Sequence, residues 1–172
     1  MSKPVGTLKK MKGWGKNRKA LDVLGKEFNR VADIVLNRIG MYYEAQTKKG
    51  IISQSPGGKR FEDLSERTLE ARKRRGTFST KALIDHGDLM NNVTYKVHRK
   101  KVFIGILRTA HNQEGMPLVN IGAVHEFGSK RANIPARPYM RPIRDSKSYR
   151  ERAKRNAKIM FERGMKRKMG IR

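Results

Sequence analysis

The sequence has no cysteine, few acidic residues and no long apolar run. Without cysteine, the chain cannot form disulfides, thiolate metal sites or a cysteine nucleophile. No stretch approaches the roughly 20 apolar residues that a membrane-spanning helix needs. The first twenty residues are basic but lack the apolar core of a signal peptide. We therefore expect a protein that is made in the cytoplasm and has no membrane partner.

The size and composition favour one domain with polar ends. The chain has 172 residues, of which 37% are hydrophobic and 33% are charged. A chain of this length can bury a core without disulfides or metals. The low apolar content suits a compact domain with polar extensions, or a subunit that completes itself in an oligomer.

Positive charge dominates the composition. The 41 Lys and Arg residues outnumber 15 acidic residues, which gives a net charge of +26. The excess is concentrated at residues 1–19, which hold seven basic residues and no acid, and at residues 141–172. Such a field favours polyanions, either nucleic acid or an acidic protein surface, although solvated tails share this composition. The candidate polyanion contacts are Lys9, Lys10, Lys12, Arg152, Lys154, Arg155, Arg163, Lys166, Arg167 and Lys168.

Hydrophobic spacing predicts a long first helix after a flexible basic arm at residues 1–18. From Lys19 to a stop at Gly50, apolar residues recur at steps of three or four and define one helix face. That face requires a sheet or another helix to cover it. Its members are Leu21, Leu24, Phe28, Val31, Val35, Ile39 and Tyr42.

The rest of the chain alternates short elements with loops. A polar helix is expected before Gly76, and a β-hairpin over residues 93–106, where apolar residues alternate with polar ones. A short helix should end at Gly128, followed by an extended segment or edge strand that contains three prolines. The chain should be helical again over residues 146–169, with a narrow apolar side and a basic remainder.

The motifs of common catalytic and metal sites are incomplete in this sequence. The glycine-rich stretch at residues 53–60 has Ser53 and Arg60 where a phosphate loop needs glycine and a hydroxyl. His125 and Glu126 begin a zinc-protease pattern, but Ser129 stands where the second histidine should be. No nucleophile elbow is present. We therefore expect no catalytic residue, cofactor or metal ion, and a protein that is not an enzyme.

Sequence-readable nucleic-acid modules are also missing. There is no zinc finger, aromatic RNA-binding stripe or convincing helix-turn-helix. The basic ends could still hold a phosphate backbone without reading its sequence.

Three motifs resemble those of the phage virion-morphogenesis and tail-completion family, which includes the Mu-type neck or head-tail connector proteins. The first is a Leu-x-Asp-x-Gly-x-Leu turn that precedes a strand pair, and the second is an Ala-x-His-Glu-Phe-Gly helix. The third is an Ile-Pro-Ala-Arg-Pro-Tyr segment. Here they are Leu83, Asp85, Gly87 and Leu89; Ala123, His125, Glu126, Phe127 and Gly128; and Ile134, Pro135, Ala136, Arg137, Pro138 and Tyr139.

The resemblance covers about residues 60–145, and the basic ends lie outside it. It implies an α+β domain over residues 19–145, with a long helix on a small antiparallel sheet, and a basic helical extension over residues 146–172. It also implies a structural virion protein that forms rings, commonly of six subunits, at the neck between head and tail. Its partners would be copies of itself, a head-closure or portal-adaptor protein, and tail terminator or tube proteins, with non-specific contact to genomic DNA.

Residues 124–142, which we name the docking strip, are the predicted interface. Its three prolines reduce the entropy lost on binding, and its arginines suit carboxylate pairing. Glu126 is a candidate partner for them, within the chain or from a neighbour. The alternatives are that Glu126 faces solvent and Arg137 pairs locally, or that the chain is a basic DNA-binding protein. The interface candidates are His125, Glu126, Phe127, Ile134, Pro135, Arg137, Pro138, Tyr139 and Arg141.

Overall fold

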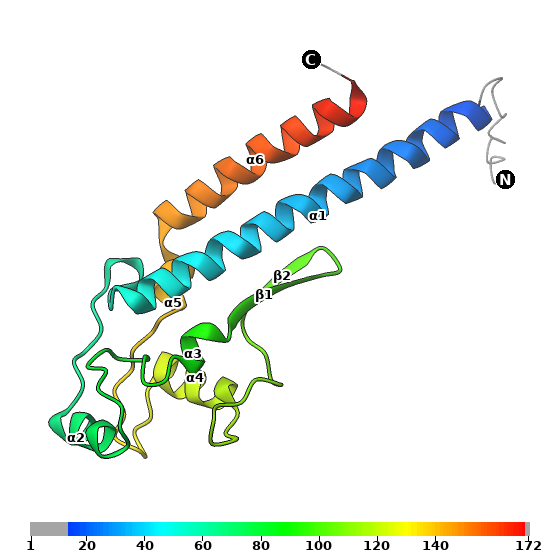
Figure 1. Cartoon of the computed structure of the whole chain (residues 1–172). Helices are drawn as coiled ribbons and strands as arrows, with labels where there is room; N and C mark the ends of the chain where they lie inside the picture. Colours follow the sequence, from blue (N-terminus) through cyan, green and yellow to red (C-terminus); the bar gives the residue numbers. More distant parts are fainter. Residues whose placement is uncertain (1–13, 171–172) are drawn as a thin grey trace, which may run out of the picture.

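The computed structural model describes residues 14–170 and has the expected α+β architecture (Figure 1). A long first helix carries a two-stranded antiparallel sheet, with short helices between and a basic helix at the end. No helix within residues 14–170 has the length and apolar character to cross a membrane. The elements are α1 (Trp14–Ile52), the 3-10 turn η1 (Pro56–Gly58), α2 (Glu66–Arg74), α3 (Asp88–Asn91), β1 (Val93–His98), β2 (Lys101–Ile106), α4 (Leu118–Phe127), α5 (Arg141–Asp145) and α6 (Lys147–Met169).

Helix α1 is the axis on which α6, the hairpin, α3 and α5 pack. Figure 1 shows α6 running back along α1 in the opposite direction, while α2–α4 gather toward the C-terminal end of α1 and the hairpin extends along its middle. Phe28 and Phe161 meet edge to face with ring centroids 5.0 Å apart. Lys168, in the last turn of α6, pairs with Glu27 at 3.1 Å. The α6 helix therefore ends opposite the second quarter of α1.

Only part of the predicted apolar stripe of α1 is covered by the described residues. Val31 and Val35 are buried, but Leu21, Leu24 and Phe28 are 69%, 46% and 50% exposed. The expectation that this whole face is covered is wrong for residues 14–170. The α6 helix ends beside Glu27, which leaves Leu21 and Leu24 uncovered, and Phe28 meets Phe161 edge to face but stays half exposed.

Both ends of α1 differ from the sequence expectation. The helix begins at Trp14 rather than Lys19, so residues 14–18 of the expected arm are helical, and residues 1–13 lie outside the described part. Gly50 does not stop the helix, which continues to Ile52. A Cβ at Gly50 would lie 2.8 Å from Pro56, so this glycine instead allows the following turn to pack closely against the helix.

The hairpin has the register that its alternating residues predict. Val93 pairs with Ile106, Tyr95 with Ile104, and the ladder closes at His98 and Lys101. The two turn residues, Arg99 and Lys100, both have positive φ, 46° and 59°, which matches the twist of a two-residue hairpin turn. The Lys100 Nζ donates to Asp33 Oδ1 at 2.7 Å and to Asn29 O at 3.0 Å, which fastens the turn to α1.

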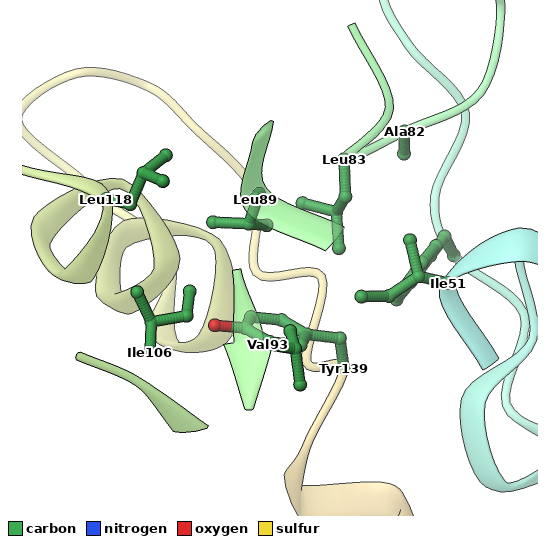
Figure 2. Packing of buried hydrophobic residues seen from close by; sticks show 9 residues of the cluster. Ile51, Ala82, Leu83, Leu89, Val93, Ile106, Leu118 and Tyr139 are labelled. Atoms are coloured by element: carbon green, nitrogen blue, oxygen red, sulfur yellow. The ribbon is translucent and has the colours of Figure 1, made fainter. Parts of the chain in front are cut away.

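The core lies where the hairpin, α3, α4 and the end of α1 meet. Figure 2 shows Leu89, Val93, Ile106 and Leu118 around the ring of Tyr139, with Ile51 of α1 on the other side. A Cβ at Gly122 would lie 2.6 Å from the Tyr139 hydroxyl and 2.9 Å from Ile106. The absence of a side chain at this position therefore lets α4 approach Tyr139, which brings the docking strip against the core.

Candidate docking site

Glu126, in the last turn of α4, holds the end of the docking strip in place. Its side chain is buried, and its carboxylate accepts hydrogen bonds from the backbone N–H groups of Tyr139, Met140 and Arg141 at 2.8, 3.0 and 2.9 Å. These donors precede or begin α5, where no earlier helical turn can supply acceptors. Three charge-assisted bonds to one carboxylate fix the path of the chain at this point.

Arg141 makes the ion pair that the sequence suggested, and it does so within the chain. Its Nε lies 3.2 Å from Glu126 Oε1, and its Nη2 donates to the Glu126 carbonyl at 2.7 Å. The guanidinium also lies over the ring of Phe127, 4.8 Å from the centroid. Arg141 thus locks α4 to α5 and covers one face of a phenylalanine that is 66% exposed.

Arg137 ties the middle of the docking strip to the loop before α2. Its backbone N–H donates to the His125 carbonyl at 2.7 Å. Its side chain is buried and donates from Nε and Nη2 to the carbonyls of Glu62 and Asp63, both at 2.8 Å. The planar fork therefore binds two main-chain oxygens here, not the carboxylate of Glu126. Within the chain, Arg137 therefore pairs locally, as the alternative expectation for this residue states.

His125 lies beside Glu126 in sequence but lines a different hollow. Its ring borders a cavity of about 680 Å³ that Arg72, Asp85 and Arg137 also line, whereas Glu126 borders a groove beside β2. His125 Nδ1 is buried without a hydrogen-bond partner in the described part of the chain. Burial, with the charges of Arg137 and Arg72, lowers the pKa of His125 to about 4. The two side chains therefore do not form an acid-base pair.

The depressed pKa of His125 predicts a pH-dependent stability. Between about pH 6.5 and 4 the unfolded chain binds a proton that the folded chain refuses, so the free energy of unfolding falls as pH falls. This group contributes a slope of at most about 1.4 kcal/mol per pH unit. His125→Gln, which cannot charge, should show a shallower fall across this window in urea titrations. Parallel curves for the two proteins would contradict the assignment of a neutral, buried His125.

The remaining strip residues form its outer side. Ile134 and Ser129 exchange backbone hydrogen bonds at 2.8 and 2.9 Å, which closes the loop that follows α4. Pro135 is exposed, and Ile134 and Pro138 are half-buried. Residues 135–140 form no regular strand, so of the two predicted forms the extended segment is present. The interface role of the strip residues stays a prediction, and Phe127 and Pro135 offer the most exposed surface for it.

Sequence reasoning missed two groups of residues near the strip. Arg72 is buried on α2 and donates to the carbonyls of Ser79, Lys81 and Ile84, so it organises the loop that carries the Leu-x-Asp-x-Gly motif. An apolar groove of about 680 Å³ also opens beside β2. The sequence did not distinguish Arg72 from its neighbours, because it stands in a run of basic residues that is typical of a solvated helix end. The groove depends on contacts between elements far apart in sequence.

The predicted polyanion contacts divide into two sets. Lys9, Lys10 and Lys12 lie outside the described residues. The seven on α6 are all exposed, and Lys168 pairs with Glu27. At 3.6 residues per turn, five of the seven share one face of the helix, next to the face that packs on α1, and no acid interrupts them. This basic stripe consists of Arg152, Arg155, Arg163, Lys166 and Arg167.

Comparison with known proteins identifies the family of the chain. A 73-residue stretch, 42% of the chain, is 41% identical to an uncharacterized protein of Methanocaldococcus jannaschii, and the alignment spans about half (49%) of that relative's length. No solved structure matches the chain. The phage virion morphogenesis family matches residues 14–148, which include α1, the hairpin and the entire docking strip. The protein therefore belongs to the phage virion morphogenesis family, a family of virion structural and assembly proteins.

Proposed function

We propose that the chain is a tail-completion or neck protein that forms a ring, commonly of six copies, at the head-tail junction of a tailed bacteriophage. Family membership supports a virion assembly role, and the neck position and the ring are the finer parts of the proposal. The partners would be further copies of the chain, a head-closure or portal-adaptor protein, and tail terminator or tube proteins. The protein would be made in the host cytoplasm and remain in the virion.

The observation that carries this proposal is the double anchoring of the docking strip. Glu126 binds three backbone N–H groups at one end, and Arg137 binds two loop carbonyls in the middle. A segment held in this way loses little conformational freedom when it docks. It presents Phe127, with two-thirds of its surface exposed, beside Arg141. An exposed aromatic residue on a rigid support is a typical anchor of a protein interface.

Phe127→Asp is expected to stop assembly while the chain still folds. The side chain is 66% exposed, so the change costs little stability but places a charge in the proposed interface. Phe78→Asp is the matched control, because Phe78 is 78% exposed and lies outside the strip. Ring formation by native mass spectrometry and infectious yield in a complementation assay should fall at least tenfold for Phe127→Asp alone. Equal yields from the two variants would remove the strip as the docking surface.

This proposal assigns no covalent chemistry to the chain. The carboxylate of Glu126 accepts structural hydrogen bonds, and His125 lines a different cavity. A hydrolase that used this pair would lose function in His125→Ala while assembly remained intact. We expect assembled His125→Ala particles to join heads and tails normally, measured by electron microscopy of lysates.

A second candidate function is non-specific DNA binding through α6, and the basic stripe is the observation that favours it. Its five cations are exposed along one side of a helix of 23 residues. Such an array can follow a phosphate backbone without reading base sequence. In a neck protein, this contact would face the DNA that passes through the junction.

Charge reversal on the stripe tests this second function. If the stripe binds duplex DNA, the affinity falls steeply between about 50 and 200 mM salt. Each lost phosphate contact then lowers the slope of log affinity against log salt concentration by about 0.9. The triple variant Arg152→Glu, Arg155→Glu, Arg163→Glu should therefore reduce the slope by about 2–3 in gel shifts. The control with equal charge change is Lys59→Glu, Lys73→Glu, Arg108→Glu, all exposed outside α6 and the docking strip. The same loss in both variants would indicate a general charge effect.

A further inference from the structure

The outer edge of β2 is unpaired in the described part of the chain. The hairpin has a two-residue turn and closes at His98 and Lys101, which makes this a hydrogen-bonded pair. The pairs alternate from there, so Val102 and Ile104 direct their backbone N–H and C=O groups away from β1. No backbone hydrogen bond within residues 14–170 reaches these groups. An edge of this kind is a template for a further strand.

An apolar groove of about 680 Å³ runs along this edge. Its floor is β2, and its walls come from α1, α4 and α5. Tyr43 and Thr47 of α1 line one side, and Ala123 and Phe127 of α4 line another. A single extended segment, which needs about 4.8 Å between strands, matches this shape.

The net charge of the chain favours an acidic occupant over a basic one. The ionised groups that line the groove are Arg141, Arg144 and Glu126. Glu126 has its carboxylate engaged by three backbone N–H groups and Arg141. The side chain of Arg144 is 69% exposed and pairs with the exposed Asp145. The whole chain carries +26, so a basic segment would be repelled and an acidic one attracted.

The residues that precede α1 do not fit this requirement. Residues 1–13 contain four lysines and no acid. The same basic sequence in a second copy would be opposed by charge.

We propose that the groove binds an extended peptide segment of a different protein, acidic and with apolar residues at every second position, which adds to the outer edge of β2 as a third strand. Backbone hydrogen bonds to Val102 and Ile104 would supply affinity, and the apolar walls and the two arginines would supply selectivity. The groove shares Phe127, Tyr139 and Arg141 with the docking strip, but the strand edge at Val102 and Ile104 lies outside the strip, so changes at Val102 test peptide binding separately from ring formation. It goes beyond the neck assignment and would exist in a single folded chain.

A defined peptide and two proline variants test this proposal. The probe is a fluorescein-labelled ten-residue peptide in which valine alternates with glutamate or threonine, and fluorescence anisotropy with the full chain measures its binding. We expect saturable binding, and at least tenfold weaker binding of the peptide with lysine in place of glutamate. Val102→Pro removes one outward donor and should weaken binding roughly tenfold. Val97→Pro, at the directly opposite position of β1, should bind as the wild type does.

A second measurement does not depend on the variants. Amide hydrogen exchange by NMR should show new protection of Val102 and Ile104 when the peptide binds, with little change at Phe103, which already pairs with Lys96. No saturable binding, equal binding of the lysine peptide, or equal loss in the two proline variants would overturn the proposal. Displacement of the probe by a peptide of residues 1–13 would assign the groove to the chain's own arm. Self-association that Val102→Pro abolishes would assign it to a second copy, and either result overturns the proposal.

Discussion

Glu126→Ala is expected to lower the free energy of unfolding by about 3–5 kcal/mol, the range for removing one partner of a buried charge network. Glu126 is 6% exposed, and its carboxylate accepts hydrogen bonds from three backbone N–H groups. Alanine would leave these donors without acceptors next to the core residue Tyr139, and would release Arg141 from its ion pair. The end of the docking strip would then lose its fixed path.

Urea denaturation followed by circular dichroism measures this effect. Glu70→Ala is the control, since Glu70 is exposed on α2 and should change stability by less than about 0.5 kcal/mol. The free energy of unfolding of Glu126→Gln should lie between those of the two alanine variants, because one carbonyl oxygen can still accept hydrogen bonds while the charge is lost. A Glu126→Ala midpoint close to that of the control would show that these hydrogen bonds do not hold the strip.

Arg137→Ala should lower the free energy of unfolding by about 2–4 kcal/mol, because it leaves buried carbonyl acceptors without donors and removes a buried side chain. The guanidinium is the link between the strip and the loop at residues 62–63. Arg137→Lys should recover less than half of the loss, since one ammonium group cannot reproduce a two-pronged donor geometry. Arg131→Ala, an exposed change in the same strip, should have little effect.

Limited proteolysis gives an independent reading of the Arg137 variants. Loss of the link should expose the loop before α2, so new cleavage near residues 60–65 should precede global unfolding. If Arg137→Lys matches the wild type in both assays, a point charge is sufficient and the fork geometry is not what anchors the strip.

The elements that follow local patterns were predictable from the sequence. The long helix, the hairpin over residues 93–106, the short helix before Gly128 and the C-terminal helix all agree with the structure. Apolar spacing and turn residues act over a few neighbours, so they can be read directly. The boundaries of α1 were less predictable, because Gly50 favours a helix end by itself. Here its lack of a side chain serves the contact with Pro56.

The candidate site was predictable in its location and not in its contacts. The motif residues from His125 to Tyr139 do gather at one place. Which partner each charged side chain takes depends on distant segments, as the contacts of Arg137 with Glu62 and Asp63 illustrate. The groove beside β2 likewise needs α1, α4 and α5 in place before it exists. No periodicity within one segment encodes such an arrangement.

Hydroxyl-radical footprinting of Phe127 in the free chain and in purified virions tests the central claim, which is that the docking strip is the assembly surface. Phe78 serves as an internal reference, because it is exposed to a similar degree and lies outside the strip. If the strip docks, oxidation of Phe127 relative to Phe78 should fall at least fivefold in the virion, as expected for a residue at the desolvated centre of an interface. An unchanged ratio would contradict the account.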